Sequence, residues 1–461
     1  MPAEVVTAFL RNRGEVLLVR RSREVGTYRR RWGGISGYVE PEGETRACPD
    51  APETSGWDAP ETSDWDAPET SARREIAEET GLLGGCTLVR RGEPFVVEDE
   101  ATDRVWRVHP FLFDCEHRAI EPSGEIAELD WTTPTAILRR ETVPALWTSY
   151  DRVRPTVETI RSDDVSGSTT LSIRALEVLR DRAGELIARE GPSLSTTDAW
   201  AELTKLAETL LETRPGMAAL TTRIDRAMAA ATDRDTAMAS DRPTATAVAR
   251  TPEAVEESTR RGIERALGVD ERAAVAAVER MDGGRILTLS RSGTVLGALL
   301  EAPVEVVVAE SRPGDEGVGV AERLAAEGKD VTLIPDAAVA HRLVTDEIDA
   351  VLVGADTVLA DGRVVNKIGT RAAAIVAARE GAPFSVVAAR DKVAPTEEFR
   401  QEFLDPGELY AGDADLAVET ALFDVTPADL VTTVITEDGP LDRAGIEAVA
   451  DEHDALAEWR R

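Results

Sequence analysis

Short β-rich runs alternate with amphipathic helical segments from residue 285 onward. The pattern consists of the runs RILTL, VEVVVAES, DVTLIP, DAVLVGAD and FSVVAAR, with segments such as GVGVAERLAAEG and TRAAAIVAAREG between them. Because parallel strands need a crossover connection, usually a helix, this alternation predicts βαβ units around a parallel sheet. We therefore expect a C-terminal α/β doubly wound, Rossmann-like domain, which binds ligands beyond the carboxyl ends of its strands.

The rest of the chain divides into two further regions, and 461 residues are too many for one ordinary core. Residues 4–20 predict two short strands across an Asn-Arg-Gly turn, and more strand-like runs follow in 86–131. From about 167 to 231 the pattern is helical, and residues 232–250 are polar and aperiodic, as in a connector. We expect three parts: an α+β domain at 1–150, a helical part at 160–270 and the Rossmann-like domain at 271–461.

Acidic residues outnumber basic ones by 86 to 53, which gives a formal net charge of −33. Only four of the basic residues are lysines: Lys205, Lys329, Lys367 and Lys392. Such a surface lacks the cations that neutralise phosphates, so we expect no direct binding to nucleic acid or to anionic membranes. Salt would screen the self-repulsion, since the Debye length falls to about 3 Å at 1 M. The composition predicts adaptation to a salty cytoplasm, as in halophilic archaea.

The sequence also indicates the compartment. No apolar run approaches the length of about eighteen residues needed to span a membrane. The N-terminus lacks the pattern of a secretory signal. Cys48, Cys86 and Cys115 are odd in number and have no ligand-like spacing, so neither a disulfide framework nor a zinc site is expected. A reduced cytoplasm is the expected location.

The segment SARREIAEETGL, residues 71–82, predicts a helix closed by Gly81. Glu75, Glu78 and Glu79 stand at i, i+3 and i+4, so their carboxylates share one helix face. Like charges on one face repel one another, and hard divalent cations prefer oxygen ligands of this kind. A metal site is therefore one interpretation. A solvated acidic face is the other, in a chain so rich in acidic residues.

REIAEETGL resembles the core of the Nudix box, which reads Gly, five residues, Glu, seven residues, then Arg-Glu-U-x-Glu-Glu-x-Gly-U, with U aliphatic. The resemblance covers roughly residues 1–150. It implies a hydrolase that splits a nucleoside diphosphate linked to another group, with Mg²⁺ or Mn²⁺ bridging the pyrophosphate. It further implies metal binding by Glu75, Glu78 and Glu79, catalytic roles for Glu75 and Glu79, and orientation of the glutamates by Arg74.

A repeat interrupts this box. The unit DAPETS runs three times from Asp50, and 29 residues separate Glu44 from Arg74 where the family has seven. Counting back seven residues from Arg74 reaches Asp66, so either Glu44 or Asp66 is a candidate to complete the metal site. We expect the insertion, at about 46–70, to be an exposed loop, with Asp66 or Thr70 capping the helix. A degenerate domain that only senses nucleotides is the alternative to a working hydrolase.

Four turns stand out in the C-terminal half: TLSRSGTV, AESRPGDEG, VGADTVLADGRVVNKIGT and AARDKVAP. The first follows a strand and opens a helix, with free backbone amides suited to an anion. Asp356 follows an apolar strand, Lys367 stands beside Gly369, and Lys392 lies in the last turn. The alternative to a binding site is a purely structural role, in which side-chain hydrogen bonds stabilise these turns.

These phrases, in this order, resemble the family that unites the alpha, beta and delta subunits of translation initiation factor 2B with two sugar-phosphate isomerases. Those isomerases act on 5-methylthioribose 1-phosphate and ribose 1,5-bisphosphate. The resemblance spans about 160–461 and includes SGSTTLSIRALEVL and RPGMAAL. In the isomerases an aspartate and a cysteine carry out ring opening and proton transfer. Asp356 fits the aspartate, but Ser290 stands at the cysteine position, and a hydroxyl is far harder to ionise than a thiol of pKa about 8.5.

The resemblance therefore implies a domain that binds a sugar phosphate or nucleotide without isomerising it. For Ser290 itself, at the start of a predicted helix, we expect a helix-capping role and not nucleophilic chemistry. The implied substrate-binding residues are Gly167, Ser168, Arg214, Ser290, Arg312, Asn366 and Lys367.

For the whole chain we expect a metal-dependent pyrophosphohydrolase fused to this binding domain. One alternative is a non-catalytic regulatory subunit with a translation-factor partner. The other is an isomerase that uses Asp356. The family also implies a homo-oligomer formed through the C-terminal domain.

Overall fold

The computed structural model describes residues 2–39, 67–100, 102–163, 166–188, 195–232, 250–281, 283–345 and 348–460. The chain forms two compact units. One comprises residues 1–155 with 184–190, and the other comprises 156–183 with 191–461. The predicted insertion lies outside the described residues up to Asp66, and so do residues 233–249 of the predicted connector.

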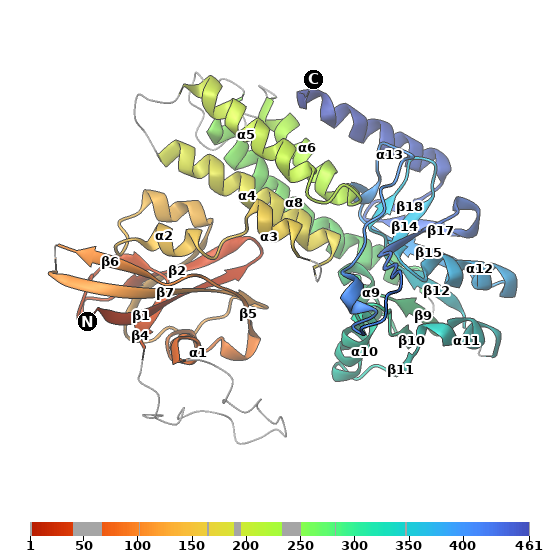
Figure 1. Ribbon diagram of the computed structural model, residues 1–461, viewed down its shortest axis with the longest axis horizontal. Coiled ribbons are helices and arrows are strands. Elements are labelled where there is room, and N and C mark those ends of the chain that lie inside the picture. Colours follow the sequence, from red (N-terminus) through yellow and green to blue (C-terminus); the bar gives the residue numbers. More distant parts are fainter. Residues whose placement is uncertain are drawn as a thin grey trace. The chain divides into compact units, whose positions relative to one another are not determined.

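The N-terminal unit is built on a mixed sheet (Figure 1). Its first two strands are joined by the predicted turn, where Arg13 and Gly14 have φ values of 54° and 79°, as two-residue hairpins require. Strands β1 and β7 pair in parallel at the centre of the order β3-β2-β1-β7-β5. The strands are β1 Ala3–Asn12, β2 Glu15–Arg21, β3 Trp32–Gly33, β4 Ile35–Tyr38, β5 Cys86–Arg91, β6 Phe95–Asp99, β7 Arg104–Cys115 and β8 Ile126–Thr132.

Helix α1, Ala67–Thr80, packs against this sheet and carries the predicted glutamates. It ends as predicted at Gly81, which has φ +70° and donates its N–H to the Ala77 carbonyl. It begins earlier than predicted, inside the last copy of the repeat. Thr70 therefore lies within the helix, so its predicted capping role is wrong. Ile76 is fully buried in the core of the unit, which fixes the rotation of the helix.

The C-terminal unit begins with helices. The predicted helical stretch from 167 to 231 is confirmed by α4 Ser168–Ala188, α5 Thr196–Leu211 and α6 Ala218–Thr232. Helix α8, Pro252–Val278, runs through the boundary expected at residue 270, so the helical part and the Rossmann-like part share one helix. Within the described part of the chain, every helix is too short or too polar to cross a membrane.

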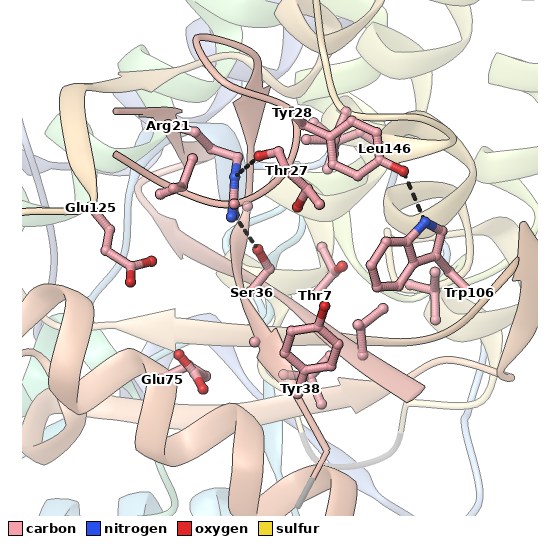
Figure 2. A pocket seen from close by; sticks show the side chains of 18 of the residues that line it. Thr7, Arg21, Thr27, Tyr28, Ser36, Tyr38, Glu75, Trp106, Glu125 and Leu146 are labelled. Carbon is pink, nitrogen blue, oxygen red and sulfur yellow. Dashed lines mark hydrogen bonds between the residues drawn. The ribbon is translucent and has the colours of Figure 1, made fainter. Parts of the chain in front are cut away.

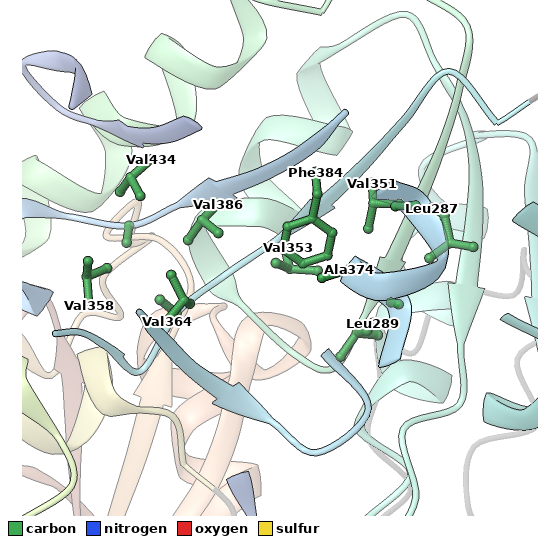
Figure 3. Packing of buried hydrophobic residues seen from close by; sticks show 14 of the residues in the cluster. Leu287, Leu289, Val351, Val353, Val358, Val364, Ala374, Phe384, Val386 and Val434 are labelled. Carbon is green, nitrogen blue, oxygen red and sulfur yellow. The ribbon is translucent and has the colours of Figure 1, made fainter. Parts of the chain in front are cut away.

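The predicted α/β architecture of the C-terminal unit is confirmed by a seven-stranded sheet with the order β11-β10-β9-β12-β15-β17-β18. All neighbours in it are parallel except the β17–β18 pair. Alternate side chains face opposite sides of the sheet. Leu287 belongs to the core cluster formed with α11, α12 and α13 (Figure 3). Ile286 belongs to the cluster formed with α8, α9 and α10. The strands are β9 Arg285–Leu289, β10 Glu305–Ala309, β11 Val331–Ile334, β12 Ala350–Val353, β15 Phe384–Val387, β17 Thr433–Thr436 and β18 Gly439–Leu441. The helices are α9 Gly293–Glu301, α10 Glu316–Ala326, α11 Val339–Thr345, α12 Thr370–Glu380 and α13 Arg443–Leu456.

This strand order places a topological switch point between β9 and β12. The chain leaves β9 toward β10 and leaves β12 toward β15. Ligands in such folds bind in the crevice that opens there, beyond the carboxyl ends of the strands. A second, three-stranded sheet has the order β13-β14-β16, and its strands lie in sequence between β12 and β17. They are β13 Thr357–Val358, β14 Val364–Lys367 and β16 Phe423–Thr426.

Candidate functional site

The three predicted glutamates of α1 lie at different depths. Glu79 is 7% exposed, whereas the Glu78 side chain is 55% exposed. Glu75 is largely buried and accepts a hydrogen bond from Arg74 at 3.1 Å, and the Arg74 guanidinium also lies 4.0 Å from Glu78. The helix therefore directs two carboxylates inward and leaves the third at the rim, with Arg74 beside two of them.

Gly37 on β4 makes room for the Glu75 carboxylate. A Cβ atom at position 37 would lie 2.0 Å from Oε1 of Glu75. No side chain other than hydrogen is compatible with the observed position of this carboxylate. The backbone of β4 at Gly37 is therefore in direct contact with the Glu75 side chain of α1.

The Gly37→Ala variant is expected to displace Glu75 and to lower hydrolytic activity roughly 10²-fold, the cost of a misplacement of about 1 Å in an active site. Steady-state kinetics with matched circular dichroism spectra would measure this effect. Gly84→Ala is the control, because a Cβ atom at Gly84 meets nothing within 4 Å. Equal losses in the two variants would show that the Gly37–Glu75 contact has no functional role.

Glu125, just before β8, joins the two buried glutamates and was missed by the sequence analysis. Burial raises the pKa of Glu79 to about 8, and the charges of Glu75 and Glu125 add to the rise, against the opposing effects of Arg21 and the Ser36 amide. The pKa of Glu75 is raised mainly by burial, with Arg74 opposing. The site is a cluster of carboxylates that disfavour one another's ionised forms.

This cluster has the donor chemistry for a hard divalent cation, which would relieve the repulsion among its carboxylates. Among the residues that the structure describes, no three Asp, Glu, His or Cys side chains are arranged as a set that could hold an ion. Mg²⁺ typically takes one or two carboxylates and completes its shell with waters and substrate phosphates. Glu75 and Glu79 fit that pattern. The candidate ligands Glu44 and Asp66 lie outside the described residues.

A cavity of about 660 Å³ is lined at one end by Glu75, Glu78 and Glu125, and Glu79 lies outside its lining. Figure 2 shows Glu75 and Glu125 on one side of it and Tyr28 and Trp106 on the other, with Tyr38 between. Trp106 is fixed, because its Nε1–H donates to the Tyr28 hydroxyl at 2.8 Å and that hydroxyl donates to Asp99 at 2.8 Å. Tyr38 is exposed, with its ring centroid 6.0 Å from that of Trp106. The cavity thus has an acidic end and an aromatic end.

The second group of predicted residues lies at the switch point of the C-terminal sheet. Ser290 follows β9 with φ +63°, and its N–H donates to the Ser311 hydroxyl at 2.6 Å. Ser292, not Ser290, caps α9 by accepting the Val295 N–H, so the capping role predicted for Ser290 is wrong. A Cβ atom on Gly354 would lie 2.7 Å from Ser292 Oγ, so the turn after β12 approaches the helix start closely.

Asp356 lies at the centre of this region, and the structure brings predicted residues around it. Burial raises the pKa of Asp356, while the charges of Lys392 and Lys367 favour its ionised form. Lys392 Nζ donates to the Ala355 carbonyl at 2.6 Å. The Lys367 ammonium pairs with Glu316 at 2.7 Å. Asp356 therefore lies among two lysines and a second carboxylate, a set of charged groups suited to a polar, charged ligand.

Other predicted residues have different surroundings. Arg214 is buried beside Glu402 and donates to the Asp163 carbonyl at 2.6 Å. Gly167 immediately precedes α4, and its carbonyl accepts the N–H of Leu171. Arg312 is exposed and pairs with an acidic neighbour, Asp315, at 2.8 Å.

The turn that precedes α12 is stabilised by its own side chains. Asn366 donates to the Thr370 hydroxyl at 3.0 Å, as the turn-stabilising interpretation expects. The carboxylate of Asp424 accepts the N–H groups of Gly369 and Arg371, and so occupies the N-terminus of α12.

Arg223 of α6 connects the parts of this second site, and no sequence motif indicated it. It is 3% exposed and donates to Asp391 at 3.1 Å, to Ser172 at 2.9 Å and to Asp270 at 3.3 Å. Asp270 in turn accepts from Thr294 at the start of α9. One guanidinium therefore links α4, α8, the start of α9 and the turn that carries Lys392.

Comparison with known proteins identifies both halves of the chain. The model of the initiation factor 2 subunit family matches residues 164–443, more than half of the sequence. The chain belongs to this family. The NUDIX domain model matches residues 1–153. The prediction of a hydrolase-type domain fused to an initiation-factor-2B-like domain is confirmed at this level.

Relatives of the family region include sugar-phosphate isomerases. The chain is 34% identical to "Ribose 1,5-bisphosphate isomerase" of Haloferax volcanii over an alignment of 308 residues, which covers 63% of this chain and 88% of that protein. It is 31% identical to the protein of the same name from Archaeoglobus fulgidus, covering 63% and 90%. The solved structure of translation initiation factor eIF-2B from Pyrococcus horikoshii shares the fold, with a TM-score of 0.51, 23% identity, and coverage of 62% and 94%. Adaptation to salt and a haloarchaeal origin stay predictions.

The C-terminal unit also contains a buried histidine, His453, whose protonation makes the stability of the protein depend on pH. His453 of α13 donates from Nδ1 to the Val393 carbonyl, and its Nε2 accepts from Arg226. Burial lowers the pKa of His453 below its ordinary value of 6.5, and the charge of Arg226 lowers it further. The native state therefore holds His453 neutral, at a pH where the unfolded chain would take up a proton.

At pH values below about 6.5, we expect the free energy of unfolding of the wild-type protein to decrease because of His453. The decrease should be at most about 1.4 kcal/mol for each pH unit. The sign follows because the unfolded state binds the extra proton, so the stability is complete at higher pH and is lost on acidification. Denaturant unfolding of wild type and His453→Gln at about pH 7 and pH 5 would measure it. The variant should lose less stability than wild type. An equal loss in both would contradict this account.

Proposed function

We propose that the N-terminal unit is a metal-dependent pyrophosphohydrolase of a nucleoside diphosphate derivative. We also propose that the C-terminal unit binds a sugar phosphate or nucleotide at its switch point. The observation that carries the first part is the single cavity with carboxylates at one end and an aromatic surface at the other. A pyrophosphate with its counter-cation fits the acidic end, and a base fits the aromatic end.

In this proposal Glu75 and Glu79 hold Mg²⁺ or Mn²⁺ at the acidic end, and Glu78, at the rim, is the third predicted ligand. When bound, such an ion neutralises pyrophosphate charge and lowers the pKa of bound water. In the same proposal Glu79 accepts the proton of the attacking water. Water adds to one phosphorus atom and the bridging P–O bond breaks, so two phosphate monoesters leave. Arg74 keeps Glu75 in position, and the Arg21 guanidinium lies beside the acidic cluster.

Tyr38→Ala is expected to raise KM for substrates that carry a base, because stacking of a base on an aromatic side chain contributes about 1–3 kcal/mol, or roughly 5- to 150-fold. The value of kcat should change little. Tyr38→Phe is the matched control and should retain the wild-type KM. A diphosphate ester without an aromatic base should show no change. A similar rise in KM for that ester would place Tyr38 outside base recognition.

The C-terminal unit supports a second candidate function, isomerisation of ribose 1,5-bisphosphate. The favouring observations are the relatives of that name and the position of Asp356 between Lys392 and Lys367. The opposing one is Ser290 at the position of the cysteine in the resembling isomerases. We therefore favour binding over turnover. Conversion of the bisphosphate to a ketose by wild type, lost in Asp356→Asn, would establish the isomerase instead.

Metal removal tests the proposed hydrolase. The purified full chain should release phosphate monoesters from nucleoside diphosphate conjugates with Mg²⁺ or Mn²⁺, stop on addition of a chelator, and resume when the ion is restored in excess. Nucleotide binding without hydrolysis under either ion would favour a nucleotide-sensing domain. Assembly into a homo-oligomer through the C-terminal unit, a translation-factor partner, a lack of nucleic-acid binding and a cytoplasmic location stay predictions.

A further inference from the structure

Two cysteines lie side by side on neighbouring strands of the N-terminal sheet, and neither of them lines the cavity. Cys86 at the start of β5 stands opposite Cys115 at the end of β7, in antiparallel register. The N–H of Glu116 donates to the Gly85 carbonyl at 2.9 Å, so the neighbouring pair is the hydrogen-bonded one. Cys86 and Cys115 therefore occupy a non-hydrogen-bonded position, where opposing Cα atoms approach to about 4.5 Å.

That position has the geometry of a cross-strand disulfide. Disulfides join Cα atoms about 4.4–6.8 Å apart, so these two thiols can be bonded without moving the strands. Both are free thiols, 8% and 7% exposed, and they pack in the same core cluster as Ile76 of α1. Burial alone would suit two small apolar side chains. Because they also lie directly opposite each other, they can form a disulfide, which two separated cysteines could not.

The electrostatic surroundings assign different roles to the two sulfurs. A hydrogen bond from the Cys115 thiol lowers the pKa of Cys86, and the charge of Arg73 lowers it further, against burial. The same hydrogen bond and burial raise the pKa of Cys115. Cys86 is thus the sulfur that more readily forms the nucleophilic thiolate, and Cys115 is the neutral thiol positioned to resolve an oxidised partner.

We infer that Cys86 and Cys115 form an oxidation site, which hydrogen peroxide converts into a reversible cross-strand disulfide. The Cys86 thiolate attacks one peroxide oxygen, the O–O bond breaks, and a proton completes the departing water, leaving a sulfenic acid at Cys86. The Cys115 sulfur then attacks the Cys86 sulfur and its thiol proton leaves with the hydroxyl as a second water. Two thiols are oxidised and one peroxide is reduced. A dithiol reductant reverses the reaction by exchange.

The consequence concerns the helix that carries the acidic cluster. Residues 81–85 alone connect α1 to Cys86, and they include the short helix Leu83–Gly85. A bond to β7 would fix the chain immediately after the helix to a central strand of the sheet. We expect oxidised protein to unfold at a higher temperature than reduced protein and to return to the lower value on reduction.

The test uses the full chain with Cys48→Ser, so that the third cysteine cannot take part. After treatment with hydrogen peroxide, denaturation and alkylation, mass spectrometry should find both thiols unavailable. The intact mass should be lower by two hydrogen atoms, and a single cross-linked peptide should join Cys86 to Cys115. Dithiothreitol should restore two alkylatable thiols. The added variant Cys115→Ser is the control and should accumulate overoxidised Cys86 without a cross-link.

Three outcomes would overturn the inference: two thiols that stay alkylatable after peroxide, a cross-link between separate chains, or sulfinic acid in place of the disulfide. Peptide mapping of the wild-type chain gives the same information if a variant fails to fold. The test does not depend on hydrolytic activity, so its result is independent of the proposed function.

Discussion

Replacing Glu79 by Gln is expected to lower kcat for hydrolysis about 10²–10⁴-fold, the usual contribution of a positioned acid–base group. Gln keeps the shape of the side chain and removes its charge. In the absence of a divalent cation, the Glu79→Gln variant should be as stable as wild type at neutral pH. The reason is that burial already disfavours the ionised carboxylate and raises the pKa of Glu79 to about 8. Activity would be measured by product release, and stability by thermal unfolding.

Glu69 on the same helix provides a matched control. Like Glu79, it is buried and does not line the cavity. Unlike Glu79, which interacts with the carboxylates of Glu75 and Glu125, it pairs with Arg73 at 2.8 Å and Arg91 at 2.6 Å. Glu69→Gln should therefore destabilise the protein while retaining kcat, the reverse of Glu79→Gln. If Glu79→Gln keeps most of its activity, or loses stability as Glu69→Gln does, Glu79 is a structural residue and the proposed mechanism is wrong.

Replacing Arg223 by Ala is expected to lower the free energy of unfolding of the C-terminal unit by about 3–5 kcal/mol, the cost of breaking a buried ion pair from one side. The variant removes one of the two guanidinium groups paired with Asp391, leaving Arg226 at 2.9 Å, and it also removes a donor to Asp270. The pKa of Asp391 is held low by Arg223 and Arg226 against burial, so its charge is present at neutral pH and depends on these partners. Denaturant unfolding would measure the loss.

Arg443→Ala is the control for the change from Arg to Ala. Its side chain is 68% exposed and pairs with Glu447 at i+4, an interaction that contributes at most about 0.5 kcal/mol. Arg223→Ala should also weaken binding of sugar phosphates, since Asp391 precedes Lys392 in the turn beside Asp356. A loss of stability below about 1 kcal/mol would contradict the assigned role of Arg223.

The C-terminal fold was predictable because its local patterns agree with the tertiary structure. The run RILTL contains Leu287 and Ile286 on opposite faces, and both are buried because helices cover both sides of a parallel sheet. The start of α1 was not predictable in this way. The repeat has the composition of a loop, but Pro68 lies in the first helical turn, where a missing N–H costs nothing.

Only those residues of the candidate sites that lie close together in the sequence could be predicted from it. Spacing along one helix was sufficient to select Glu75 and Glu79. Glu125 and Trp106 join them through strand pairing between distant segments, which no local pattern encodes. Ser290 and Ser292 stand in one turn. Only the observed backbone, with Ser290 at positive φ, shows which serine caps the helix.

The central claim is that the acidic end of the N-terminal cavity hydrolyses nucleoside diphosphate derivatives. Its most direct test is phosphorus NMR of the purified full chain in about 1 M KCl, where surface repulsion is screened. The mixture would hold Mg²⁺, ADP-ribose and related conjugates. We predict that monophosphate resonances grow with wild-type protein, stop growing when a chelator is added, and are absent with Glu79→Gln. Conjugate resonances that broaden on binding but never convert to monophosphates would contradict the account and favour a domain that only binds nucleotides.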